Sequence, residues 1–279
     1  MNSAMSNGTL RWGVPFAVLG AVPPGELGRI CDRRAHRRHL AAMMLDLAER
    51  GHLRLLDAGN DLDGGYALDW YLLLLGEQAP LDLDATDPAA VATAHVVAGD
   101  ASSSAGPWAG RGPRPDAGGL RPHQQAFLDV VRGTDSRLLS RVRAAPAIKG
   151  VEAALVGDLC ERGWLRDRFG AARRTCPGRA VAAELRAARA DLAASPGEAQ
   201  VTASLLPVAV ALRLEAVWMA RLGQQRPAVP VWFTGGRSGP GRGWRGVCAA
   251  ASAMSAAPPP GGGAGSACVN YGSSSGPLG

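Results

Sequence analysis

The stretch "DLAERGHLR" at Asp46–Arg54 recurs as "DLCERGWLR" at Asp158–Arg166, with seven of nine residues identical. An aspartate and an arginine four positions apart can form an ion pair on the outer face of a helix, worth roughly 0.2 to 0.5 kcal/mol. The Leu after each Asp faces inward, the Gly takes a positive φ and ends the helix, and x-Leu-Arg begins a strand. The repeat therefore predicts two copies of a structural helix-to-strand unit, marked by Asp46, Arg50, Gly51, Asp158, Arg162 and Gly163.

The residues around the first copy predict a winged-helix-like unit over residues 25–98, which follows an extended segment at residues 1–24. A short helix is expected near Glu26. A longer one, over residues 36–50, is indicated by apolar residues at i, i+3, i+4 and i+7, namely Leu40, Met43, Met44 and Leu47. After it, "HLRLL" and "YALDWYLL" alternate in hydrophobicity on either side of the turn-rich "AGNDLDGG", which predicts a β-hairpin. A helix over residues 89–97 completes this unit. Asp61 and Asp63 could hold a cation, but the hairpin turn itself accounts for them.

Residues 99–121 have the composition of a linker, and a second winged-helix-like unit is expected over residues 122–170. Its helices are predicted at residues 123–132, 135–143 and 147–162. The "WLRDRF" that follows supplies at most a short strand, so this copy is expected to have lost most of its wing.

A C-terminal helical pair is predicted over residues 171–234, followed by a disordered tail over residues 235–279. The first helix covers residues 178–194, which are rich in alanine. The second covers residues 198–222 with a kink at Pro207. Gly, Ser, Pro and Ala dominate the tail. The predicted fold class is thus mainly α with small β-hairpins: two winged-helix-like units, a C-terminal helical pair and a disordered tail.

The net charge of +6 suggests an anionic partner, but the charge is divided unevenly along the chain. Residues 57–100 hold nine acids and no Lys or Arg, whereas residues 111–245 hold 22 basic residues against 11 acids. Possible contacts to an anionic partner lie at the start of the first long helix, at Arg33, Arg34, Arg37 and Arg38. Because wings normally follow the phosphate backbone, an acidic first wing and a missing second wing disfavour nucleic acid, although binding stays possible.

No pattern of catalytic, cofactor-binding or metal-binding residues is found. The five cysteines never form a C-x-x-C pair, which makes a zinc ribbon or a disulfide framework improbable. His36 and His39, with Cys31 nearby, are interpreted as solvated helix residues. The chain has no G-x-S-x-G motif, His52, His95 and His123 suggest no triad, and the Gly-rich residues 234–243 contain no lysine for a phosphate loop. The sequence therefore predicts no enzyme activity and no small-molecule ligand.

No window of the chain reaches the roughly 18 to 20 apolar residues that cross a bilayer, so the sequence predicts a soluble, cytoplasmic chain. The longest apolar window, residues 199–212, contains Pro207 and is interpreted as a short buried helix.

The order of several segments resembles the C-terminal region of YciQ-like predicted bacterial membrane proteins, a domain family of unknown function. The segments are "GVPFAVLGAVPPGELG", "HLAAMMLDLAERGHLRL", "ALVGDLCERGWLR", "RRTCPGRAVAAELRAARADLA", "LLPVAVALRLEAVW", "PVWFTGG" and the Gly/Ser tail. The likeness covers residues 13–272. It implies that residues 26–222 correspond to the family's cytoplasmic helical part.

This chain departs from the family in several places. From this sequence no β-sandwich or first membrane anchor is expected, and between Phe169 and Arg173, where the family has apolar spans, only "GAA" is found. Val208 stands where the family has Tyr, and Arg213 stands where it has Gly. The family brings no catalytic residues. The resemblance therefore implies a non-enzymatic cytoplasmic interaction domain, whose partner is a protein or a membrane-associated assembly; the alternative is a winged-helix DNA-binding transcription regulator.

Overall fold

The computed structural model describes residues 22–32, 37–57, 69–75, 119–168, 171–194, 205–215, 217–218, 220, 230, 232–234 and 240–255. Its helices are α2 (Pro24–Cys31), α3 (Arg37–Glu49), α5 (Pro122–Arg132), α6 (Leu139–Ala144), α7 (Ile148–Glu161), α8 (Cys176–Ala194), α9 (Leu206–Ala211) and α11 (Pro240–Ser255). Its strands are β1 (Leu53–Asp57), β2 (Trp70–Leu74), β3 (Leu165–Arg168), β4 (Ala171–Arg174) and β5 (Phe233–Thr234). The prediction of a mainly helical chain with small β-hairpins is confirmed for these residues.

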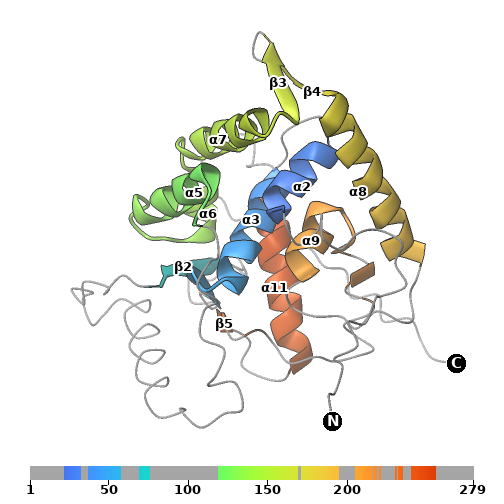
Figure 1. Cartoon of the computed structure of the whole chain (residues 1–279). Helices are drawn as coiled ribbons and strands as arrows, with labels where there is room; N and C mark the ends of the chain where they lie inside the picture. The colour runs from blue at the N-terminus through green and yellow to red at the C-terminus, as the bar shows by residue number, and fades with distance from the viewer. Residues whose placement is uncertain are drawn as a thin grey trace, which may run out of the picture.

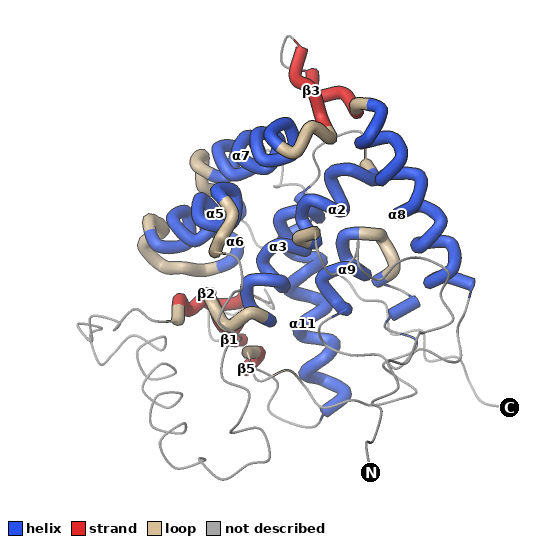
Figure 2. Tube along the Cα trace, in the orientation of Figure 1, coloured by secondary structure: helices blue, strands red, loops and turns tan. Residues whose placement is uncertain are grey.

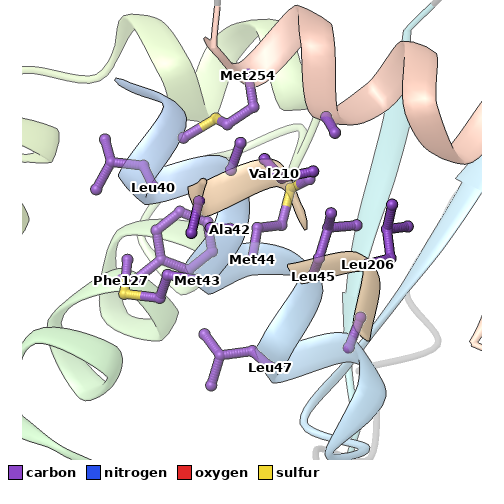
Figure 3. Close-up of a cluster of buried hydrophobic side chains, with 14 of the residues drawn as sticks. Leu40, Ala42, Met43, Met44, Leu45, Leu47, Phe127, Leu206, Val210 and Met254 are labelled. Carbon is purple, nitrogen blue, oxygen red and sulfur yellow. The ribbon is translucent and has the colours of Figure 1, made fainter. Parts of the chain in front are cut away.

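Helix α3 lies at the centre of the described structure, and α2, α9 and α11 pack around it (Figures 1 and 2). The predicted apolar stripe of α3 is buried, and so are the residues between its members, including Ala41, Ala42 and Leu45. Leu206 and Val210 of α9 and Met254 of α11 converge on this helix (Figure 3). A helix that is apolar on one stripe normally leaves its other faces to water. Here those faces are covered, because helices from distant parts of the sequence surround it.

The predicted hairpin after α3 is confirmed: β1 pairs with β2 in antiparallel register, with Leu53 opposite Leu74 and Asp57 opposite Trp70. The alternation of its apolar residues places Trp70, Leu72 and Leu74 on the buried side. A third strand, β5, joins β1 in parallel and gives the sheet order β2-β1-β5. The expected turn at residues 58–68 and the expected helix at residues 89–97 lie outside the described residues.

Both copies of the repeated sequence end their helices in the same way. Gly51 and Gly163 have φ angles of 80° and 69°, the left-handed region that glycine adopts without steric cost. In the first copy the His52 N–H donates to the Leu47 carbonyl at 2.9 Å, and in the second the Trp164 N–H donates to the Leu159 carbonyl at 3.0 Å. These bonds satisfy carbonyls that a helix end leaves without partners. The helix-ending role of the two glycines is thus confirmed.

The second copy is followed by a complete hairpin, which corrects the prediction that its wing was lost. Strands β3 and β4 are antiparallel, with Leu165 opposite Arg174 and Arg166 opposite Arg173. The sequence signal was weak because the strands are short and carry arginine and alanine rather than alternating apolar residues. The hairpin extends away from the helices beyond the ends of α7 and α8 (Figure 1).

Two predictions about the C-terminal region are wrong. Residues 240–255 form helix α11 instead of a disordered tail, and Trp244, Val247 and Met254 are buried in the core. The glycines and alanines that suggested disorder also allow close approach: a Cβ on Gly246 would lie 2.6 Å from the ring of Phe233. Pro207 does not kink a long helix but lies in the first turn of α9, where its missing N–H costs no hydrogen bond. No described helix is both long enough and apolar enough to cross a membrane.

The two predicted units share a single hydrophobic core. Phe127 of α5 is fully buried in the same cluster as the apolar residues of α3. The units also meet through their backbones, since Tyr71 of β2 bridges to Leu138, and the Leu72 N–H donates to the Arg137 carbonyl at 3.0 Å. Most of the predicted linker lies outside the described residues. The described residues before and after the linker pack together into one body rather than two separate ones.

Candidate functional site

The aliphatic core contains a group of three titratable side chains that come from three different helices. Glu26 lies in the first turn of α2, His123 in the first turn of α5 and Asp158 in the last turns of α7. Each offers one donor atom, and these three atoms lie within 4.8 Å of one another. Glu26 and His123 are 0 % exposed, and Asp158 is 6 % exposed. We call these residues the buried polar cluster.

His123 and Asp158 form a hydrogen-bonded pair inside this cluster. The carboxylate oxygen Oδ2 of Asp158 accepts from the His123 ring at Nδ1 and from the His123 backbone N–H at 3.3 Å. A proton on Nδ1 leaves Nε2 of the neutral ring as an acceptor, and this Nε2 is buried without a hydrogen-bond partner. Burial lowers the pKa of His123, against the opposing effect of Asp158, so the neutral ring is the favoured form.

Glu26 is a buried carboxyl that faces a positive charge. Its Oε2 lies 3.2 Å from Nε of Arg162, but the contact lacks hydrogen-bond geometry, and neither Glu26 oxygen has a hydrogen-bond partner. Burial raises the pKa of Glu26 from 4.5 to about 7, although Arg162 and Arg121 act in the opposite direction. The guanidinium of Arg162 also stacks over the Trp164 ring at 5.1 Å. The cluster therefore combines an acceptor nitrogen with a carboxyl close to half-ionised at neutral pH.

The repeated aspartates do not occupy the predicted outer face. Asp46 and Arg50 are in contact at 3.5 Å, as predicted, but both are partly buried. The side-chain amide of Gln124 donates to Asp46 at 3.0 Å. Asp158 is buried and pairs with His123, while Arg162 turns to Glu26. The two repeats thus present their aspartates to adjacent residues at the start of α5, because the positive end of a helix favours negative charge.

The arginines predicted to contact an anionic partner are engaged within the protein where they are described. Arg37 donates to the Arg143 carbonyl at 3.2 Å, and Arg38 lies 3.3 Å from Glu215. Arg33 and Arg34 lie outside the described residues. Among the described residues, the arginines at the start of α3 therefore make contacts within the protein and do not form an exposed cationic patch.

His39 was interpreted as a solvated helix residue, and this is wrong. It is 1 % exposed, and its Nε2 lies 3.3 Å from Oδ2 of Asp32. Arg213 donates to the same Asp32 oxygen at 3.2 Å, although Arg213 has a positive φ of 61° that glycine would adopt more easily. Burial acts to raise the pKa of Asp32, but the hydrogen bonds from His39 and Arg213 outweigh it and lower the pKa from 3.8 to about 2. His36 lies outside the described residues.

We expect Asp32→Asn to lower the free energy of unfolding by about 2 kcal/mol at pH 6, since a pKa shift of one unit corresponds to about 1.4 kcal/mol. A lowered carboxyl pKa stabilises the fold above the unfolded value of 3.8, and this contribution is lost as the pH falls through about 2. Urea unfolding at pH 6, 4 and 2 should show the difference from wild type shrinking with pH. The exposed Asp191→Asn should change little at any pH; a constant Asp32→Asn deficit would contradict the assignment.

The second candidate site is the basic hairpin β3–β4, with the adjoining first turn of α8. Residues 162–179 contain six arginines and one acid, Asp167. Arg166 and Arg173 are exposed and directly opposite each other across the two strands. Arg174 is held by the protein, since it donates to the Cys31 carbonyl at 2.6 Å. Like charges in directly opposite positions destabilise a hairpin, so this pair favours an external anion over a structural role.

Sequence reasoning missed both sites. His123 and Asp158 are 35 positions apart, and no spacing rule links them to each other or to Glu26. A usable signal was the lone histidine one residue after a helix-starting proline, at the helix end that attracts carboxylates. Comparisons with protein-family models, curated proteins and solved structures found no match to this chain.

Proposed function

We propose that this chain is a non-enzymatic interaction domain that docks on an anionic membrane surface through the basic hairpin β3–β4. The observation that carries the proposal is the exposed pair Arg166 and Arg173, placed opposite each other on an element that extends from the body (Figure 2). Each arginine near an anionic leaflet contributes about 1 kcal/mol to binding. Such docking needs a cluster of positive charge but no shaped pocket.

The resemblance to YciQ-like membrane proteins supports the same partner. In that family, apolar spans occupy the position of the β3–β4 turn, so this part of the domain would face the membrane from the cytoplasmic side. We therefore propose that the chain is, or derives from, the cytoplasmic region of such a protein. A protein partner that binds an apolar face has less support, because Leu75 is the one large apolar side chain exposed among the described residues.

A non-enzymatic role is supported by the position of the buried polar cluster. Its titratable groups could donate and accept protons, but Glu26 and His123 are fully buried. A catalytic acid or base must come within hydrogen-bonding reach of its substrate. We therefore assign this cluster to the interior architecture and the exposed hairpin to binding.

We expect the full chain to co-sediment with vesicles of phosphatidylcholine and phosphatidylserine, but not with phosphatidylcholine alone, and less at 500 mM than at 50 mM NaCl. The double variant Arg166→Gln/Arg173→Gln should bind roughly 30-fold more weakly, from about 1 kcal/mol per arginine. Because the two charges repel, it should be at least as stable as wild type to urea.

The matched control is Arg132→Gln/Arg141→Gln, which removes the same charge from exposed positions on α5 and α6. It should retain most of the binding. Equal losses in the two double variants would point to net charge rather than to the hairpin, and equal binding to neutral vesicles would remove the proposal altogether.

A winged-helix DNA-binding regulator is the second candidate, favoured by the order α5-α6-α7-β3-β4 and by the basic hairpin in the place of a wing. The helix that would read base edges is α7, whose exposed residues are Lys149, Gly150, Ala153, Gly157 and Glu161. These small and oppositely charged residues offer little to bases or phosphates. Absence of duplex binding at about 50 mM salt, where phosphate contacts are strongest, would exclude this candidate.

A further inference from the structure

Several polar atoms of the buried polar cluster have no hydrogen-bond partner, and their burial makes this energetically costly. Both carboxylate oxygens of Glu26 and the Nε2 atom of His123 are buried without a hydrogen-bond partner. Each such group costs roughly 1 to 3 kcal/mol, because the hydrogen bonds made to water in the unfolded chain are lost. The contacts of Asp158 with His123 and of Arg162 with Glu26 leave these atoms unsatisfied, although one ligand atom from each of the three residues lies within 4.8 Å of the others.

The donor set identifies what could bind. An imidazole nitrogen and two carboxylates are ligands of divalent transition-metal ions such as Zn²⁺ and Mn²⁺. One ligand atom of each residue lies within 4.8 Å of the other two, so a single ion placed among them can contact all three. We infer that Glu26, His123 and Asp158 bind one divalent transition-metal ion that ties together helices α2, α5 and α7.

The charges around the cluster are compatible with such an ion. Glu26 and Asp158 together carry two negative charges when ionised, against the one positive charge of Arg162, so the cluster has a net negative charge that attracts a cation. Arg162 contacts Glu26 at Oε2, so Oε1 remains for the ion, and the guanidinium keeps its contact with Trp164 at 5.1 Å. The burial of the three side chains makes this ion part of the folded structure rather than a catalyst, since water and substrate have no access to the two fully buried ligands. Binding would then accompany folding.

The test uses the full chain, unfolded in denaturant with a chelator and refolded with or without Zn²⁺. We expect about one zinc per chain after gel filtration, and a Tm higher by about 5 °C when free zinc exceeds the Kd about 100-fold. Glu26→Gln and His123→Gln should each lose the zinc and the response of the Tm. If the wild-type chain refolded in the presence of Zn²⁺ holds no zinc and has the same Tm as the chain refolded without Zn²⁺, the inference is overturned.

His39→Gln is the matched control, because it also removes a buried histidine in contact with an aspartate but leaves the cluster intact. It should retain the zinc, and loss of zinc in this variant with retention in His123→Gln would overturn the inference. If the cluster variants do not fold, the absorption spectrum of Co²⁺ bound to the wild-type chain identifies the ligands. Weak visible bands without a near-ultraviolet thiolate band support the nitrogen and oxygen ligands, whereas a thiolate band assigns the ion to cysteine and overturns the inference.

Discussion

Phe127→Ala is expected to lower the free energy of unfolding by about 3 to 5 kcal/mol, the usual cost of removing a buried aromatic side chain. Phe127 belongs to α5 but is fully buried in the same apolar cluster as Met43 of α3 (Figure 3). The cavity would therefore open between the two predicted units rather than inside one of them. Chemical denaturation followed by circular dichroism would measure the loss.

The same experiment distinguishes one shared core from two independent ones. We expect a single transition that moves as a whole to lower denaturant concentration, because the apolar residues of both units form one cluster. Leu75→Ala is the control, since Leu75 is 41 % exposed and its removal should change stability by no more than about 0.5 kcal/mol. Two separate transitions, of which Phe127→Ala shifts only one, would contradict a shared core.

Gly178→Ala is expected to destabilise the protein by about 3 kcal/mol, because the added methyl group has no space. A Cβ at this position would overlap the carbonyl oxygen of Trp164 and lie 2.8 Å from its carbonyl carbon. That carbonyl accepts hydrogen bonds from the N–H and the hydroxyl of Thr175, at 3.0 and 3.2 Å, where α8 begins. The substitution would push the hairpin β3–β4 away from α8, and urea unfolding would report the loss.

Gly157→Ala provides a matched control for the glycine substitution. Gly157 is an exposed residue within α7, and a Cβ there would meet no atom within 4 Å. Since alanine favours the helix, this variant should be more stable by roughly 0.5 to 1 kcal/mol. If both variants lost the same stability, steric overlap at Trp164 would not be the cause.

The accuracy of the sequence-based predictions depended on how far apart in the sequence the interacting residues lie. Helices α5, α7 and α8 and the hairpin of β1 and β2 were placed within a few residues, because stripes, alternation and glycine stops are local signals. The hairpin β3–β4 and helix α11 were missed, since their arginine, alanine and glycine residues resemble loop composition. Their folded state depends on neighbours such as Phe233 and Trp164.

The sequence did not predict the buried polar cluster, for the same reason. The repeated sequence marked Asp158 and Arg162 but indicated that they would pair with each other in solvent. In the fold they pair with His123 and Glu26. Which partner a buried charge selects depends on the residues that meet it across helices, and those contacts leave no periodic trace in the sequence.

The sequence alone determined where α3 and α7 end, because a glycine at positive φ acts on its own backbone whatever surrounds it. It also determined the apolar side of α3 and the pairing of β1 with β2. Only the tertiary structure decided that α3 is enclosed, that α11 completes the core, and that three titratable side chains meet inside it. Burial and charge pairing are properties of the assembled chain, since they depend on which distant segments exclude water from a given side chain.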